Sequence, residues 1–187
     1  DLHRLIRRQR QMCIRDRDEI RLSEKYRGRE ILFDLVEMLG EARIDQPEQG
    51  YVKETYFVMD EDSRRTLQQH PPSRVSYRLR VPPRSRFEAA VALHPAVWDV
   101  AEGDGVVFEA FVVRRRLPGR WKRRLLLRKH LDPRTNPRHR CWVEVAADLG
   151  KFAGKTVTLE LVTRMENDSK PDFNTAGWAN PVIVSKP

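Results

Sequence analysis

Side chains that could bind a sugar gather in two stretches of the sequence, residues 132–140 and residues 172–180. The candidates are Asp132, Asn136 and Arg138 in the first stretch and Asp172, Asn174 and Trp178 in the second. An indole covers the apolar C–H face of a sugar ring, while carboxylate, amide and guanidinium groups hydrogen-bond its hydroxyls. We therefore expect Trp178 to be a stacking platform and the polar residues to be hydroxyl partners. The alternative is that Trp178 lies in the core before a final strand.

Residue types that could catalyse a reaction are present, but they form no known catalytic pattern. Glu109, Glu144 and Glu160 lie on expected strands, and glycoside hydrolysis requires a pair of carboxylates. Strand glutamates of this kind usually face solvent, and the sequence identifies no pair. It also contains no Gly-x-Ser-x-Gly elbow, His-Glu-x-x-His helix, P-loop or dinucleotide fingerprint. The sequence therefore predicts a protein that is not an enzyme.

Metal ligands and nucleophiles are equally sparse. Cys141 follows His139 by two residues, but a zinc site or an activated thiol needs further partners at regular spacing. Next to Trp142 at the start of a strand, Cys141 is interpreted as a small core or edge residue. Asp104 and Asp172 could hold a structural Ca²⁺, because hard oxygen ligands from turns suit that ion. We expect no other cofactor.

The charge of the chain is strongly basic, with a formal net charge of +9 over 187 residues. Its basic residues are 28 Arg and eight Lys, an imbalance that fits a GC-rich genome as well as phosphate recognition. The arginine-rich stretch 114–124 is the candidate nucleic-acid surface, and it predicts binding that weakens steeply with salt. We regard nucleic acid as the least favoured partner. No apolar run approaches the ~20 residues of a membrane span, so no transmembrane segment is predicted.

Residues 1–17 are set apart from the rest of the chain. Residues 11–17 match an in-frame translation of the mosaic-end adaptor used in transposon-based sequencing libraries. The alternative is a basic amphipathic helix with Leu2, Leu5 and Ile6 on one face. We exclude the segment from functional reasoning as an adaptor-derived addition, which removes Cys13 and any internal disulfide. Because the chain also begins without Met, we expect a fragment whose native sequence before Asp18 is unknown.

The elements that would position these residues are mostly strands. Residues 105–113 follow a Gly-Asp-Gly turn signal and contain a single charge, Glu109, so we expect an interior strand covered on both faces. Ile31, Leu35 and Met38 form a helical stripe, which predicts a short amphipathic helix over 29–39 that ends at Gly40. Further strands are expected at 51–59, 75–81, 87–93, 125–131, 142–145, 156–163 and 181–185, with an arginine-rich hairpin at 114–122.

These elements predict an all-β fold. Eight or so short strands separated by Pro and Gly are typical of an antiparallel β-sandwich of the jelly-roll type, here with a short N-terminal helix. We divide the chain into the adaptor-derived segment 1–17, a helical connector 18–50 and a β-sandwich domain 51–187.

The sequence from about residue 73 to residue 184 resembles the galactose-binding-like jelly rolls, in particular the carbohydrate-binding modules of the NPCBM type. Gly105-Val106-Val107-Phe108-Glu109-Ala110-Phe111-Val112 is similar to that family's V-x-F-x-V-x-V strand, and 143–149 with 156–162 resemble its paired strands. Asp172 with residues 176–180 resembles its Asp-x-x-x-Trp segment. The family's V-D-G-K hairpin is replaced by Val113-Arg114-Arg115-Arg116, and its acidic-His pair by Asp172-Phe173-Asn174.

Two classes of function follow from this resemblance. The first is a non-catalytic, carbohydrate-binding module, extracytoplasmic or attached to the cell envelope in a bacterial protein, with a glycan as its partner. The alternative is a structural scaffold domain that binds no ligand and packs on the membrane portion of its parent protein. Fold analogy alone does not choose between them.

Overall fold

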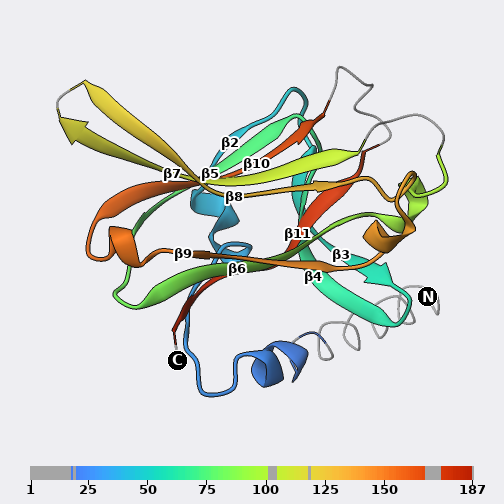
Figure 1. The fold of residues 1–187 in the computed structure, drawn as a ribbon, viewed down its shortest axis with the longest axis horizontal. Helices are drawn as coiled ribbons and strands as arrows, with labels where there is room; N and C mark the ends of the chain where they lie inside the picture. Colours follow the sequence, from blue (N-terminus) through green and yellow to red (C-terminus); the bar gives the residue numbers. More distant parts are fainter. Residues whose placement is uncertain (1–17, 19, 101–104, 118, 167–173, 187) are drawn as a thin grey trace, which may run out of the picture.

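Two antiparallel β-sheets pack face to face in the computed structural model, which describes residues 18, 20–100, 105–117, 119–166 and 174–186 (Figure 1). One sheet has the order β3-β4-β11-β6-β9, with β1 also paired to β11. Its strands are β1 (Ile31–Asp34), β3 (Val52–Met59), β4 (Asp62–Gln69), β6 (Ser85–Leu93), β9 (Val143–Asp148) and β11 (Ala176–Ser185). This architecture confirms the predicted all-β sandwich.

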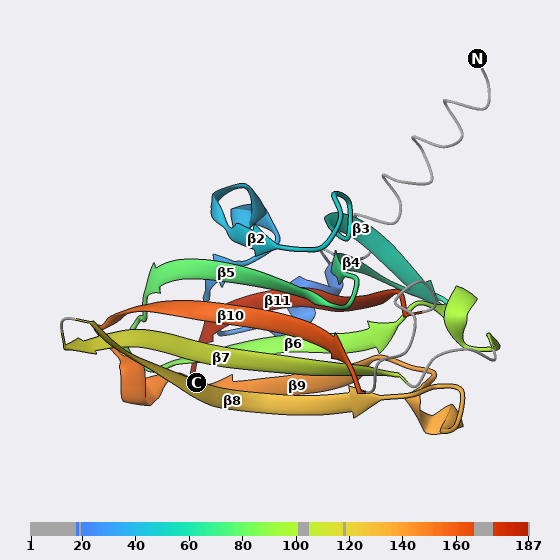
Figure 2. The same cartoon turned by 90° about the horizontal axis from the view of Figure 1, so that it is seen from above.

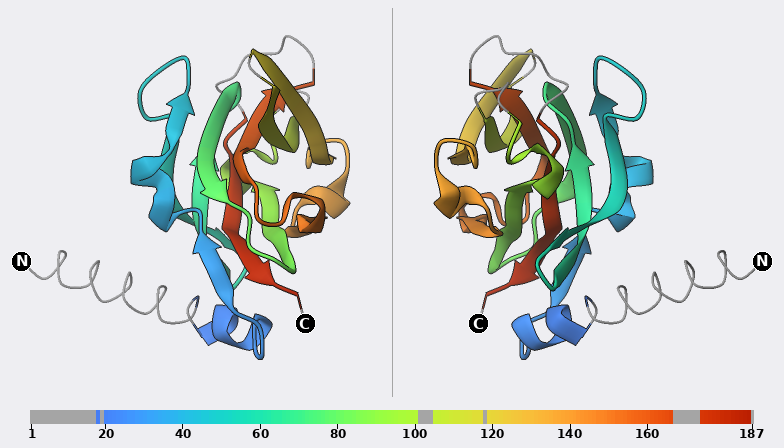
Figure 3. Two further views of the ribbon diagram at one scale, coloured as in Figure 1. Left: turned by 90° about the vertical axis from the view of Figure 1, so that its left-hand side faces the viewer. Right: turned by 90° about the vertical axis from the view of Figure 1, so that its right-hand side faces the viewer.

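The other sheet has five strands in the order β2-β5-β10-β7-β8. They are β2 (Arg43–Asp45), β5 (Ser73–Arg80), β7 (Val106–Leu117), β8 (Arg120–Leu131) and β10 (Thr156–Met165). Short 3-10 helices lie in the connections: η1 (Glu37–Glu41), η2 (Pro95–Val97), η3 (Pro137–His139) and η4 (Gly150–Phe152). Figure 2 looks onto the five-stranded sheet with the other sheet behind it, and Figure 3 shows the sandwich from its two ends. None of the described helices has the length and apolar character needed to cross a bilayer.

The predicted interior strand is β7, which pairs with β10 on one side and β8 on the other. Its two faces are covered in different ways. Val106, Phe108 and Ala110 are fully buried against the opposite sheet. On the outer face, the Arg123 guanidinium lies 3.4 Å from the centre of the Phe111 ring, and Arg128 donates to Glu109 at 2.6 Å.

The centre of the core is an aromatic contact between the sheets. Trp178 of β11 is fully buried, with its ring 5.3 Å from Phe108 of β7 and 6.1 Å from Phe87 of β6. Both contacts are edge-to-face, which is a favoured geometry for aromatic pairs. The alternative interpretation of Trp178 as a core residue therefore holds, and the predicted stacking platform is wrong.

The helix predicted over 29–39 is also wrong. Residues 31–34 form β1, which pairs with β11, and only the single 3-10 turn η1 follows. Ile31, Phe33 and Leu35 recur at the spacing of two that a strand requires, whereas Ile31, Leu35 and Met38 fit a helical stripe, so pairing with β11 decides between the two periods. Because 18–50 supplies one strand to each sheet, that segment is part of the sandwich and not only a connector.

The helical residues lie earlier in the chain, at 18 and 20–25. The turn that follows places Tyr26 on Val182 and Val184, on the outer face of the six-stranded sheet. Asp18 is 3% exposed and accepts hydrogen bonds from the Arg65 backbone N–H (2.8 Å) and from Asn180 Nδ2 (3.1 Å). Asp18 thus joins this segment to the bulge in β11.

Strand β4 is absent from the sequence prediction because its buried positions are mostly polar. Thr66 and Gln69 are as fully buried as Leu67. The Gln69 side-chain amide donates to the carbonyls of Ser73 (3.0 Å) and Leu161 (2.9 Å), which are on β5 and β10 of the other sheet. An amide that bonds across the sandwich replaces the apolar residue that alternation would require.

We expect Gly177→Ala to destabilise the domain by about 1–3 kcal/mol, because it overpacks a filled site. A Cβ at Gly177 would clash with the buried, β-branched Thr66 and lie 3.0 Å from the Phe57 ring. Gly40→Ala is the matched control, since a Cβ there meets nothing within 4 Å. Urea unfolding measures both variants, and an equal stability for the two would contradict the packing described here.

Candidate functional site

The first predicted stretch, residues 132–140, folds back on itself. Asp132 is 7% exposed, and its carboxylate accepts from the Arg134 backbone N–H (3.1 Å) and the Thr135 hydroxyl (2.6 Å). Asn136 Oδ1 accepts from the Arg138 backbone N–H (3.1 Å) and caps η3. These side chains hold the loop in shape, while Arg138 itself is exposed.

The second predicted stretch contributes to the same end of the sandwich. Asn174 is fully buried, and its Oδ1 accepts from Arg134 Nη1 at 3.2 Å, which joins the two stretches. Asp172 and Asp104 lie outside the described residues, so the calcium prediction stays a prediction. The structure thus brings Asp132 and Asn174 together around Arg134 but buries them, and it leaves Arg138 as the exposed member.

Two half-buried indoles, Trp98 and Trp142, lie near this end. Trp142 stacks on Phe57 with 6.4 Å between the ring centres, and the Arg64 guanidinium lies 5.0 Å from the Trp142 ring. Trp98 donates from Nε1 to the Leu93 carbonyl at 2.9 Å. Sequence reasoning gave Trp98 no role, because a single Trp after a 3-10 turn has no periodic neighbours. Both indoles are packed against the outer face of the sheet.

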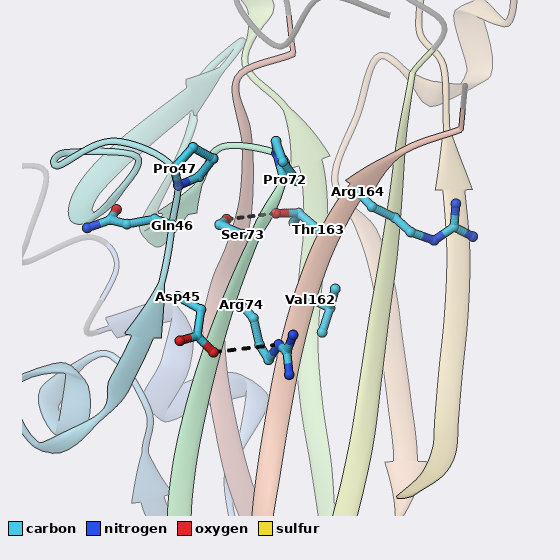
Figure 4. A pocket seen from close by; sticks show the side chains of 9 residues that line it. All are labelled: Asp45, Gln46, Pro47, Pro72, Ser73, Arg74, Val162, Thr163 and Arg164. Atoms are coloured by element: carbon cyan, nitrogen blue, oxygen red, sulfur yellow. Dashed lines mark hydrogen bonds and ion pairs between the residues drawn. The ribbon is translucent and has the colours of Figure 1, made fainter. Parts of the chain in front are cut away.

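A groove lies elsewhere, on the outer face of the five-stranded sheet. Two adjoining cavities, of about 300 Å³ and about 380 Å³, share Asp45 and Arg74, and we call their union the sheet-face groove. The first, shown in Figure 4, is lined by Asp45, Gln46, Pro47, Pro72, Ser73, Arg74, Val162, Thr163 and Arg164. The second is lined by Glu41, Arg43, Asp45, Arg74, Ser76, Arg78, Val113, Thr158 and Glu160.

Arg74 is the central side chain of the sheet-face groove. Its guanidinium lies 3.8 Å from an oxygen of Asp45 and 3.7 Å from one of Glu160. The register of β2 against β5 sets the first pair directly opposite each other, and the register of β10 against β5 sets Glu160 beside them. Figure 4 shows Asp45 and Arg74 facing each other across the groove.

The chemistry of the sheet-face groove is mixed. Carboxylates accept hydrogen bonds, guanidinium groups donate them, and the hydroxyls of Ser76 and Thr158 can do either, while the buried hydroxyls of Ser73 and Thr163 bond each other (3.1 Å). The lining has four arginines and three carboxylates, so it concentrates no large charge of either sign. Such a surface suits a neutral ligand that both donates and accepts. Sequence reasoning missed the groove because its side chains come from segments that meet only through strand register.

Structural comparison finds a similar β-sandwich fold in carbohydrate-binding modules of known structure. One neighbour is the CBM51 of a Clostridium perfringens GH95 protein in complex with methyl-galactose, with TM-score 0.52, 13% identity, and coverage of 82% of this chain and 99% of that one. Another is the C-terminal family 22 carbohydrate-binding module of Clostridium thermocellum Xyn10B, with TM-score 0.50, 11% identity, and coverage of 83% and 93%. The TM-scores and coverages show a shared fold, and at such low identities the likeness extends to the fold alone.

Sequence comparison finds a relative in an archaeon. An uncharacterized protein of Archaeoglobus fulgidus is 34% identical over 130 residues, which cover 65% of this chain and 31% of the relative. The chain therefore spans about a third of the length of that protein. The sequence matches no family model.

We expect His94 to make the domain less stable in acid. Burial lowers the pKa of His94, and its Nδ1 accepts from the Ala96 backbone N–H (3.2 Å), which requires the neutral ring. Below the ordinary histidine pKa of about 6.5, His94 takes up a proton in the unfolded chain more readily than in the folded domain. The free energy of unfolding therefore decreases as the pH is lowered.

His94→Asn keeps a capping acceptor without a titrating ring. As the pH is lowered from about 8 to about 5, the urea midpoint of the wild type should therefore decrease relative to that of His94→Asn. Two midpoint curves that stay parallel over this interval would contradict the assignment.

Proposed function

We propose that this domain is a non-catalytic module that binds an uncharged glycan in the sheet-face groove. The observation that carries the proposal is the union of two cavities around Arg74, in which donors and acceptors alternate on one sheet face. A sugar presents hydroxyls that both donate and accept, and it carries no charge to match a patch of one sign. Each cavity is within the range of about 300–1,000 Å³ typical of small-ligand sites.

The sheet-face groove also offers apolar surface for the C–H groups of a sugar. Pro47, Pro72 and Val162 line the first cavity beside the polar groups. Rings and branched aliphatic side chains give such contact with little loss of conformational freedom. Arg74 would hydrogen-bond vicinal hydroxyls through its planar fork, with Asp45 and Glu160 as acceptors on either side.

The neighbours of known structure support the choice of ligand class. One of them is described in complex with methyl-galactose, and the other is described in terms of ligand binding in its cleft. Those descriptions belong to those proteins, and they guide which glycans to test here. We further propose that the domain is an extracytoplasmic or envelope-associated part of a longer bacterial protein, because surface glycans are accessible there.

A scaffold domain without a ligand is the second candidate. It is favoured by the loop of residues 132–140, where the side chains of Asp132 and Asn136 hydrogen-bond to groups of the loop itself. A domain whose loop groups are internally satisfied is suited to packing on the membrane portion of its parent protein. The two candidates differ in whether the isolated domain binds any sugar.

We expect Arg74→Ala to weaken glycan binding by about ten- to a hundredfold, because a hydrogen bond to a charged group contributes about 1.5–3 kcal/mol. A glycan array identifies the ligand, and isothermal titration calorimetry measures the affinity of each variant. Lys151→Ala is the matched control, since Lys151 is an exposed cation on η4, which does not line the groove.

Arg138→Ala separates the sheet-face groove from the loop site predicted from sequence. If Arg138→Ala abolishes binding and Arg74→Ala does not, the ligand binds at the loops and the groove assignment is wrong. If no glycan on the array binds the wild-type domain, the scaffold candidate replaces the binding module. Thermal unfolding of each variant excludes a loss of binding through misfolding.

A further inference from the structure

The hairpin of β7 and β8 extends beyond the sandwich as a two-stranded ribbon (Figures 1 and 2). Pairing between β10 and β7 ends at Thr158 with Val113, and from Arg114 onward β7 pairs only with β8. We call residues 114–117 and 119–124 the arginine arm. It contains six Arg and one Lys and no acidic residue.

Apart from Arg123, the charges of the arginine arm whose side chains the structure describes are not used to hold the domain together. Arg123, at its base, bonds Glu160 at 2.8 Å. Five other basic residues of the arm have described side chains, and none of them forms an ion pair within the described part of the chain. They are Arg114, Arg115, Arg120, Lys122 and Arg124. Arginines on the remaining strands, such as Arg64 and Arg65, each contact two or more carboxylates.

The sequence of the arginine arm opposes its own pairing. Arg114 lies directly across from Lys122 in the strand register, and like charges in that position are destabilising. No carboxylate among the described residues forms an ion pair with Arg114 or Lys122, so these two charges can be neutralised by anions outside the domain. The complementary partner is therefore an anionic surface.

Trp121 gives this surface a second property. Its side chain is 67% exposed, and it lies opposite Arg115 near the turn of the hairpin. An indole with an apolar body and a polar N–H is stable at the level of lipid headgroups. Binding to single-stranded nucleic acid instead uses several aromatic rings along a strip, and the arginine arm presents one.

We propose that the arginine arm docks on an anionic lipid surface, with Trp121 at the depth of the headgroups. Cations occur on both strands of the ribbon, so an approach by its tip brings positive charge to the lipid on every side. The inference is independent of glycan binding, because Arg115, Arg120, Trp121, Lys122 and Arg124 do not line the sheet-face groove.

Vesicle sedimentation tests the proposal with the full chain. We expect binding to vesicles of phosphatidylcholine mixed with phosphatidylglycerol and none to phosphatidylcholine alone. The fourfold variant Arg115→Ala/Arg120→Ala/Lys122→Ala/Arg124→Ala should bind more weakly by about fivefold for each residue removed, and so by more than about a hundredfold in total. Because it relieves repulsion and touches no core residue, this variant should remain folded.

A matched control removes the same charge elsewhere. Arg27→Ala/Lys53→Ala/Lys151→Ala/Lys155→Ala replaces four exposed cations outside the arginine arm, and it should keep most of the affinity. Residues 1–17 and their six Arg are identical in every variant, so a difference in affinity between variants is caused by the replaced residues. Tryptophan fluorescence should shift to the blue on the mixed vesicles, and Trp121→Phe should abolish the shift.

Three results would overturn the proposal. Equal binding to both kinds of vesicle would exclude recognition of anionic lipid, and an equal loss in the matched control would show a response to net charge alone. Failure to bind the mixed vesicles, together with retention of a single-stranded DNA oligonucleotide that the fourfold variant loses, would assign the arginine arm to nucleic acid. Glycan binding should be the same in the fourfold variant and in the wild type.

Discussion

The contact of Trp178 with Phe108 and Phe87 is the interaction on which the rest of the structure depends. It joins the two sheets at their centre, since Trp178 and Phe108 belong to opposite layers. Once an aromatic residue of this size is fully buried there, the alternate apolar residues of β6, β7 and β11 must point into the core. Polar residues on those strands must then face outward, where none of the described helices forms a covering layer over most of the surface. The outer faces are therefore where charge has to be managed.

Long arginine side chains on the outer faces form ion pairs with the glutamates of the strands. Glu88, Glu109 and Glu160 are each less than 10% exposed, and each contacts at least two arginines. The arginine stems cover apolar surface while their guanidinium groups neutralise the carboxylates. The expectation that strand glutamates face open solvent is wrong for Glu109 and Glu160. Much of the arginine excess is thus structural, which is why total charge is a poor guide to the partner of this domain.

Apolar alternation made most of the fold predictable. Strands β5, β6 and β7 were found because their inward positions are apolar and their flanks contain Pro or Gly. Strand β4 was missed because its inward positions include Gln69, whose hydrogen bonds to the other sheet form only after folding, and because Thr66 is buried on its other face. The segment around Ile31 was misassigned because two periods fit it, and the pairing that decides lies about 150 residues away in β11, which no local pattern contains.

The sheet-face groove was beyond sequence analysis for a related reason. Asp45 and Arg74 are far apart in the chain and become neighbours only through the register of β2 on β5. The loop residues were easier to nominate because they are close in sequence, yet closeness let Asp132 accept from the Thr135 hydroxyl and Asn136 accept from the Arg138 backbone N–H. Polar residues that lie together in a loop therefore favour internal hydrogen bonds. Polar groups on a sheet face are instead fixed in place by backbone pairing, as Arg74 is between Asp45 and Glu160.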